Sequence, residues 1–149
     1  MAERLMVVVG YEAAELLDIA CVTTTLAMAN GIGAPSVPYR VLLVGPGSGP
    51  LVCGSGLVLG SEQPLERLTG PLDTLIVSGG TGFERAAADG RLVGHVRRLA
   101  RESRRVASVC TGPGCWPQPG SSTGAVRPRT GGSRPRFVDL FMSWCRFAH

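Results

Sequence analysis

The stretch Val106-Ala107-Ser108-Val109-Cys110-Thr111-Gly112 decides the fold that the sequence predicts. An apolar run with β-branched residues ends on a cysteine and a small-residue turn, which is typical of a buried strand that leads into a helix. In open α/β sheets, ligands bind at the carboxyl ends of the strands. A cysteine on such a turn lies near helix N-terminal N–H groups, so Cys110 is a candidate reactive thiolate. The alternative is a buried structural cysteine.

Upstream of this stretch, the pattern predicts alternating strands and helices. The predicted strands are residues 5–10, 39–44 and 73–77, the predicted helices are 14–30 and 91–103, a hairpin is expected at 51–53 and 57–59, and one helical turn at 64–68. Short connections between such elements indicate a parallel, doubly wound sheet with right-handed crossovers. The strand ends at Gly10, Ser78 and Cys110 then converge on one crevice.

Each predicted helix has a periodic apolar pattern. In 14–30, helical spacing relates Leu16, Ala20, Thr24 and Ala27, flanked by Leu17 and Met28, and Asn30-Gly31 supplies the stop. In 91–103, Leu92, Val96 and Leu99 form one face, and the arginines 97, 98 and 101 form the other, which we expect to be solvated.

Composition excludes several classes of protein. The chain has 149 residues, enough for one domain, and its 44% hydrophobic and 17% charged residues indicate a globular protein. Its apolar runs are too short to cross a membrane and no leader is recognisable, so we expect a cytoplasmic location. Five cysteines without a CxxC pair argue against a disulfide framework or zinc site, and neither metal nor cofactor is expected. Residues 1–112 are neutral, so the net charge of +4 lies in the tail and predicts no nucleic-acid patch on the folded part.

Three stretches together resemble a known family. They are Glu15-Leu16-Leu17-Asp18-Ile19-Ala20, Val77-Ser78-Gly79-Gly80-Thr81-Gly82 and Ser108-Val109-Cys110-Thr111-Gly112. Their order and spacing are similar to the ThiJ/PfpI superfamily of class I glutamine-amidotransferase-like domains. Within it, they look closest to the N-terminal sensing domain of AraC-type transcriptional regulators and to the isonitrile hydratases. The resemblance implies a flavodoxin-like α/β sandwich.

The resemblance also implies roles for individual residues. Cys110 would stand at the nucleophile elbow, with Asp18 meeting it and Thr111 beside it, as the matching residues do in isonitrile hydratases. A carboxyl next to a thiolate keeps its proton and donates a hydrogen bond, because adjacent anions repel. Gly79, Gly80 and Thr81 would line the ligand or oxyanion pocket.

Each of these residues also has a plainer interpretation. Asp18 alone is an ordinary first-turn acid of a helix, and the glycines after residue 77 are an ordinary strand-to-helix turn. The sequence departs from the family at Cys21-Val22, which stand in place of its usual glycine-proline pair after the Asp18 segment.

The pattern breaks down after Gly112. Residues 113–149 hold five prolines and five glycines, which predicts an irregular tail after a partial domain at 1–112. With GC-rich codons, residues 112–132 can be back-translated so that another frame encodes an apolar helix, a glycine turn and a strand ending in Thr-His-Trp. That product resembles the segment after the cysteine in AraC-associated proteins. We therefore hypothesise a frameshift near Gly112 that removes the elbow helix and the DNA-binding helix-turn-helix.

Three functions follow as expectations. The first is a sensing domain of an AraC-type regulator that binds a small molecule and does not itself bind DNA. The second is a cysteine-dependent enzyme of the isonitrile hydratase type, using Cys110, Asp18 and Thr111. The third is an inactive structural fragment. Loss of the elbow helix would uncover one face of the sheet, so a homo-oligomer is also expected.

Overall fold

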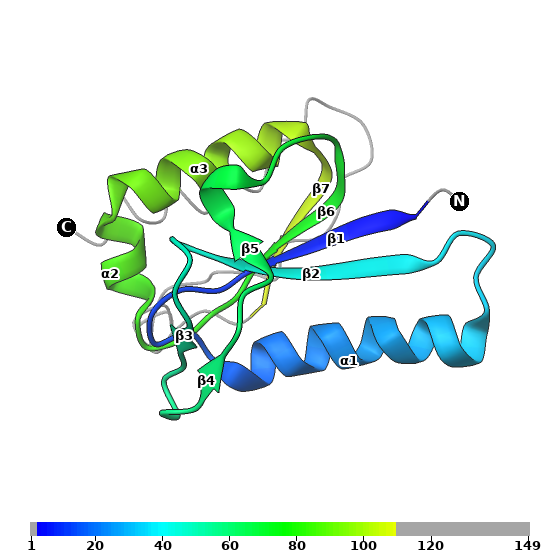
Figure 1. Cartoon of the computed structure of the whole chain (residues 1–149), viewed down its shortest axis with the longest axis horizontal. Coiled ribbons are helices and arrows are strands. Elements are labelled where there is room, and N and C mark those ends of the chain that lie inside the picture. The colour runs from blue at the N-terminus through cyan, green and yellow to red at the C-terminus, as the bar shows by residue number, and fades with distance from the viewer. Residues whose placement is uncertain (1–2, 110–149) are drawn as a thin grey trace, which may run out of the picture.

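A parallel five-stranded sheet forms the centre of the computed structural model, which describes residues 3–109. Its strands are β1 (Arg4–Val9), β2 (Tyr39–Gly45), β5 (Gln63–Pro64), β6 (Leu72–Val77) and β7 (Ser103–Ser108). They lie in the order β5-β2-β1-β6-β7, and every pair is parallel (Figure 1). The sheet is thus the doubly wound one that the sequence predicts.

Helices cover the two faces of this sheet. Helix α1 (Leu16–Gly33) lies on one face, while α2 (Phe83–Ala88) and α3 (Gly90–Glu102) lie on the other (Figure 1). An antiparallel hairpin of β3 (Leu51–Val52) and β4 (Val58–Leu59) lies near the start of α1, and a 3₁₀ turn, η1 (Leu65–Arg67), precedes β6. The arrangement is a three-layer α/β sandwich of flavodoxin type.

The core is built on the central strand β1. Its last three residues, Val7, Val8 and Val9, are fully buried, because helices cover both faces of the strand. Leu75 from β6 and Leu99 from α3 are also fully buried. A continuous apolar run is therefore the correct signature for β1, and the strand forms where the sequence predicts it.

Helix α3 is amphipathic, as its spacing predicts. Asp89 caps it, with Oδ1 accepting the N–H of Arg91 at 2.9 Å, an interaction that contributes about 1 kcal/mol. The expectation that the arginine face is solvated is wrong for Arg98. Arg98 is half-buried, and its guanidinium donates to the carbonyl oxygens of Leu68 (2.9 Å) and Leu65 (3.4 Å), so it fastens η1 to α3.

Helix α1 differs from its prediction in two ways. Its one buried side chain is Ile19, whereas Thr24 and Ala27 of the predicted stripe are exposed. Asn30 does not end the helix, which continues to Gly33. The Asn30 amide instead donates to the Tyr39 carbonyl (2.7 Å) and accepts the Tyr39 N–H (2.8 Å), which fixes the end of α1 to the start of β2.

The other boundaries agree closely with the predictions, with three differences. Strand β5 and helix α2 were not predicted, because each is too short to show a period of its own. Strand β7 begins at Ser103 rather than Val106, since Arg104 and Arg105 pair with β6 despite their charge. The predicted tail and residues 110–112 lie outside the described residues.

The strand order creates a topological switch point between β1 and β6. From β1 the chain moves to β2 on one side, and it later returns to β6 on the other side. Val9 pairs with Val44 in one direction and with Val77 in the other, so the carboxyl ends of the three strands are level. This is the place where α/β sheets of this kind bind ligands.

Candidate functional site

Two loops meet at the switch point, one after β1 and one after β6. The Glu15 N–H donates to the Gly79 carbonyl (2.8 Å), and the Gly82 N–H donates to the Ala13 carbonyl (3.1 Å). Because these bonds join backbone to backbone, the two loops form one rigid unit. The start of α1 is thereby held against the end of β6.

Asp18 lies within this unit. It is the third residue of α1, half-buried, and its Oδ2 accepts the backbone N–H of Gly79 at 3.1 Å. Glu15, not Asp18, supplies the helix cap, since its Oε1 accepts the Leu17 N–H (3.2 Å). Asp18 is therefore not an ordinary first-turn acid: its carboxylate faces the loop after β6 and meets one of the predicted pocket glycines.

Gly80 is at a position that only glycine fills without strain. Its φ is +135°, and a Cβ there would lie 2.5 Å from both the Ala13 oxygen and the Glu15 nitrogen. Within residues 3–109, no acceptor takes the Gly80 N–H. Thr81 follows on the exposed surface of the loop. The geometry leaves the Gly80 N–H as the candidate oxyanion donor, while the N–H of Gly79 is directed to Asp18.

A pair of buried hydroxyl groups positions the loop after β6. The Tyr11 hydroxyl donates to the Ser78 carbonyl (2.8 Å), and Ser78 Oγ donates to the Val9 carbonyl (2.9 Å). Both residues are 3% exposed. The sequence placed Ser78 at a strand end but did not predict these hydrogen bonds, although a tyrosine directly after a strand-ending glycine is a usable signal for a side chain placed at a sheet edge.

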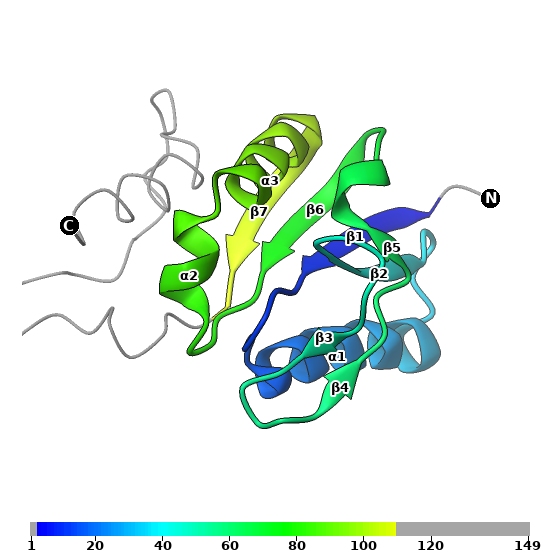
Figure 2. The ribbon, with the colours of Figure 1, turned by 60° about the vertical axis from the view of Figure 1, so that its left-hand side comes forward.

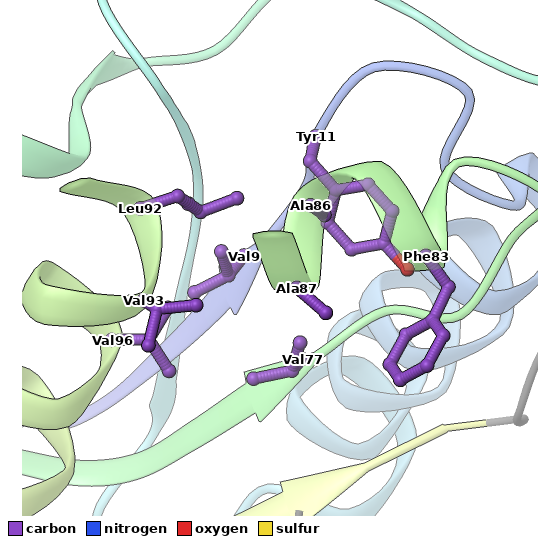
Figure 3. A pocket seen from close by; sticks show the side chains of 9 residues that line it. All are labelled: Val9, Tyr11, Val77, Phe83, Ala86, Ala87, Leu92, Val93 and Val96. Atoms are coloured by element: carbon purple, nitrogen blue, oxygen red, sulfur yellow. The ribbon is translucent and has the colours of Figure 1, made fainter. Parts of the chain in front are cut away.

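A small apolar cavity lies on the other side of Tyr11, between the sheet and helices α2 and α3 (Figure 3). It encloses about 20 Å³ and is lined by Val9, Tyr11, Val77, Phe83, Ala86, Ala87, Leu92, Val93 and Val96. Sites for organic ligands are usually about 300–1,000 Å³. The cavity is therefore a packing gap under α2, and the switch-point loops remain the candidate site.

Cys53 is a second thiol close to these loops. It is 3% exposed, and burial, followed by the negative charges of Glu15 and Glu12, raises the pKa of the thiol. A thiol of raised pKa is a poor nucleophile at neutral pH. Cys53 therefore has the character of a structural cysteine.

The remaining predicted site residues, Cys110 and Thr111, lie outside the described residues. The last described residue is Val109, whose N–H donates to the Val77 carbonyl at 3.1 Å. That bond continues the pairing of β7 with β6 up to the loop that carries Ser78 and Gly79. The structure thus brings together Asp18, Gly79 and Gly80, and Thr81 follows Gly80 in the chain. The described residues stop at Val109, directly before Cys110.

Comparison with known proteins adds a sequence relative and a set of structural neighbours. The chain is 30% identical over 107 residues to an uncharacterised Streptomyces lividans protein from the 5′ region of cpoL, an alignment that covers 72% of this chain and 73% of that protein. No family model matches the sequence.

The structural neighbours share the fold at low sequence identity. A ThiJ/PfpI family protein from Pseudomonas syringae superposes with a TM-score of 0.62 at 17% identity, covering 74% of this chain and 43% of that one. DJ-1beta from Drosophila melanogaster superposes with a TM-score of 0.60 at 19% identity, covering 74% and 57%. A candidate transcriptional regulator from Vibrio parahaemolyticus gives 0.57 at 16% identity, covering 71% and 56%.

These alignments extend over most of the present chain but over roughly half of each solved neighbour. Within that region, the chain shares the fold of these neighbours. The chain therefore has the fold of the DJ-1/ThiJ/PfpI proteins.

Proposed function

We propose that this chain is a ThiJ/PfpI-type sensing domain of an AraC-type transcriptional regulator, which binds a small molecule at the switch-point loops. The observation that carries the proposal is the hydrogen bond from the Gly79 N–H to Asp18, because it holds a carboxylate at the carboxyl ends of the strands, where α/β sheets bind ligands. Similarity to a candidate transcriptional regulator supports the same assignment.

The site would recognise a small polar or electrophilic molecule. Asp18 offers its second carboxylate oxygen, Gly80 offers an N–H without an acceptor in residues 3–109, and Cys110 follows one residue after Val109. A donor, an acceptor and a thiol together suit a carbonyl, a nitrile-like group or an isonitrile. We also propose that the protein is cytoplasmic and that it is a truncated form of such a regulator.

Ligand binding, and not DNA binding, is the role assigned to residues 3–109. Helix α3, an amphipathic helix of this region, packs its apolar face against the sheet, where Leu92, Val96 and Leu99 are buried. The ten arginines of residues 1–112 are balanced by ten acidic residues, so this part offers no net positive charge to phosphates.

An enzyme of the isonitrile hydratase type is the second candidate. The unaccepted N–H of Gly80 favours it, since such a donor stabilises the negative charge that develops when a nucleophile attacks. The reaction would add water across the isonitrile carbon, R–NC + H₂O giving the formamide R–NH–CHO, with Cys110 attacking first and water releasing it.

One experiment separates the two candidates. The full chain is incubated with a simple alkyl isonitrile and with small aldehydes, while product is followed by NMR and thermal stability by calorimetry. A sensor gives a rise in Tm without product, and ligand at a hundred times its Kd stabilises by about 2.7 kcal/mol. The rise should vanish in Asp18→Ala and persist in Glu62→Gln, whose exposed carboxylate lies beside β5.

Formamide formation that depends on Cys110 would replace the sensing proposal with the enzyme. Stabilisation that is unchanged in both Asp18→Ala and Cys110→Ala would place the ligand elsewhere and overturn both candidates.

A further inference from the structure

A second cavity lies between the sheet and the segment that joins β5 to β6. Its volume is about 260 Å³, more than ten times that of the gap under α2. The residues that line it are Leu5, Arg40, Leu42, Glu62, Gln63 and Leu68. We call it the β2–η1 cavity. Sites for organic ligands usually begin at about 300 Å³, so this cavity has room for one small molecule.

The floor of the cavity is the face of β1 and β2 that points away from α1. Leu5 and Val9 lie on the same face of β1, since side chains on a strand alternate, and Val9 lines the gap under α2 and α3. Arg40 is level with Leu5 in the sheet, and Leu42 follows it on the same face of β2. Helix α3 packs on β6 and β7, so it leaves this part of the face to the segment between β5 and β6. Figures 1 and 2 both show that segment on the α3 side of the sheet.

The wall above this floor is held at both ends. At one end, the Glu62 N–H donates to the Leu43 carbonyl (2.9 Å), which attaches the chain to β2 directly before β5. At the other end, the Leu68 carbonyl accepts from the Arg98 guanidinium (2.9 Å), which attaches η1 to α3. Leu42 and Leu68 are 5% and 4% exposed, so the interior is apolar. A cavity fixed in this way needs little reorganisation to take a ligand, which favours binding.

The polar side chains at the cavity have no partner of their own. Within residues 3–109, neither the Arg40 guanidinium nor the Glu62 carboxylate takes part in an ion pair or a side-chain hydrogen bond, and the same holds for the Gln63 amide. Arg98, which also reaches this segment, is instead occupied by two carbonyl oxygens and by Glu102 (3.6 Å). Opposite charges that line one cavity without pairing leave the space between them to a ligand.

We propose that the β2–η1 cavity binds a small zwitterion, namely an α-amino acid with an apolar side chain. Arg40 binds the carboxylate, since a guanidinium matches its two oxygens with two parallel hydrogen bonds. Glu62 accepts from the ammonium group, and the Gln63 amide can donate to the carboxylate or accept from the ammonium. The apolar side chain of the ligand lies on Leu5 and Leu42.

Charge and size together select this class of ligand. A simple anion would meet Arg40 but also the carboxylate of Glu62, and a simple cation would meet Glu62 but also Arg40, so each would gain one attraction and suffer one repulsion. A molecule that carries both charges is attracted at both places. Sugars offer little apolar surface to the leucines, and the volume excludes nucleotides and larger cofactors.

The cavity is separate from the switch-point loops and from α1. Asp18, Gly79 and Gly80 do not line it. Helix α1, the one helix of residues 3–109 that could cross a membrane by length and composition, lies on the opposite face of the sheet (Figure 1). A ligand in this cavity would therefore bind independently of one at the switch-point loops.

Isothermal titration calorimetry of the full chain with L-leucine tests the site. We expect a Kd on the order of 0.1–1 mM, since a small ligand with two partly exposed charges gains only moderate affinity. Arg40→Met keeps an apolar stem and should weaken binding at least about tenfold, because the bidentate pair is lost. Arg101→Met is the matched control: Arg101 is exposed on α3 and does not line the cavity, so its loss should leave the Kd unchanged.

Three analogues of leucine separate the contributions to binding. Isocaproate lacks the ammonium group, isoamylamine lacks the carboxylate, and glycine lacks the apolar side chain, so each should bind at least about tenfold more weakly. Glu62→Gln should weaken leucine and strengthen isocaproate, since it removes an acceptor for the ammonium and a repulsion for the anion. Neutral isonitriles and aldehydes carry neither charge, so the same substitution does not affect their binding at the switch-point loops.

Three results would overturn the proposal. They are no binding of leucine up to about 10 mM, by calorimetry or by a rise in Tm, a Kd that Arg40→Met leaves unchanged, and isocaproate that binds the wild type as tightly as leucine. The last result would assign the cavity to simple carboxylates.

Discussion

Gly80→Ala should strongly destabilise the switch-point loops, because it combines backbone strain with a clash against backbone atoms. The residue has a φ of +135°, which an alanine adopts only with strain. Its Cβ would lie 2.5 Å from the Ala13 oxygen and the Glu15 nitrogen and 2.7 Å from the Ala14 carbon, whereas ordinary contacts begin at 3.4 Å. All three atoms are backbone, so no side chain can rotate away.

The expected loss of stability is the sum of two effects. Holding a non-glycine residue in a sparsely populated φ region costs about 1–3 kcal/mol. Forcing backbone apart by up to 0.9 Å, the difference between 3.4 and 2.5 Å, costs about 1–3 kcal/mol more, as other overpacked cores do. Gly80→Ala should therefore destabilise the protein by roughly 2–6 kcal/mol, a large share of the 5–15 kcal/mol of a typical domain.

Urea unfolding followed by circular dichroism measures this loss, and two other glycines separate its causes. Gly56 has a φ of +82° with nothing within 4 Å of its Cβ position, so Gly56→Ala reports the backbone strain alone, about 1–2 kcal/mol. Gly94, within α3, has neither a positive φ nor a close neighbour, so Gly94→Ala should stabilise by about 0.5–1 kcal/mol.

The reasoning would be refuted if Gly80→Ala were no more destabilising than Gly56→Ala. Equal losses would mean that the loop after β6 does not press against the start of α1, and the geometry of the candidate site would then be wrong.

Three further predictions concern residues away from the loops. Arg98→Met should cost about 1–3 kcal/mol in urea unfolding, since it removes the guanidinium that donates to the Leu68 carbonyl; a neutral result would show that water replaces it. Although burial acts against it, hydrogen bonds from Arg104 and Thr74 lower the pKa of Asp73, so its stabilising contribution is complete above about pH 4 and is lost as pH falls through the lowered value. Asp73→Asn should accordingly destabilise by about 0.5–1 kcal/mol at pH 7 and by less near pH 2, and a gap that stayed constant with pH would contradict this. In dilute native protein at pH 8, iodoacetamide should modify the exposed Cys21 at least about tenfold faster than the buried Cys53, a difference that should disappear in urea; equal native rates would contradict the burial of Cys53.

Much of the fold could be predicted from the sequence because its strands are continuous apolar runs. Val7, Val8 and Val9 are buried on both faces, and such a run has only one stable place in an α/β domain, the centre of a covered sheet. The parallel, doubly wound sheet followed from the short connections, and the structure confirms it. The elements that were missed, β5 and α2, are two and six residues long, too short for periodicity to show.

Helix α1 shows where periodicity misleads. Nearly all of its residues are apolar or small, so the sequence does not distinguish the face on the sheet from the face in solvent. Tertiary contacts decide which face of the helix is buried: Ile19 lies in the core, and two hydrogen bonds join Asn30 to Tyr39. The same ambiguity explains why the exposure of Leu17 and Met28 was not predicted.

The candidate site could be predicted in part. The motifs located Asp18, Gly79 and Gly80, and the structure brings these three together. Their chemical roles, and those of Cys110, Thr111 and Thr81, stay predictions. The sequence did not reveal that Tyr11 and Ser78 hold the loop, because a hydrogen bond across 67 residues leaves no local pattern.

The central proposal is that Asp18, which accepts the Gly79 N–H, stabilises the thiolate of Cys110. The most direct measurement is the rate of Cys110 alkylation as a function of pH, followed by peptide mass spectrometry in wild type, Asp18→Ala and the control Glu62→Gln. If Asp18 stabilises the Cys110 thiolate, as we propose, Asp18→Ala moves the midpoint of the profile upward by about one pH unit or more, with Glu62→Gln unchanged. Superimposable profiles, or a midpoint that moves downward as it would on removal of a neighbouring anion, would contradict the account.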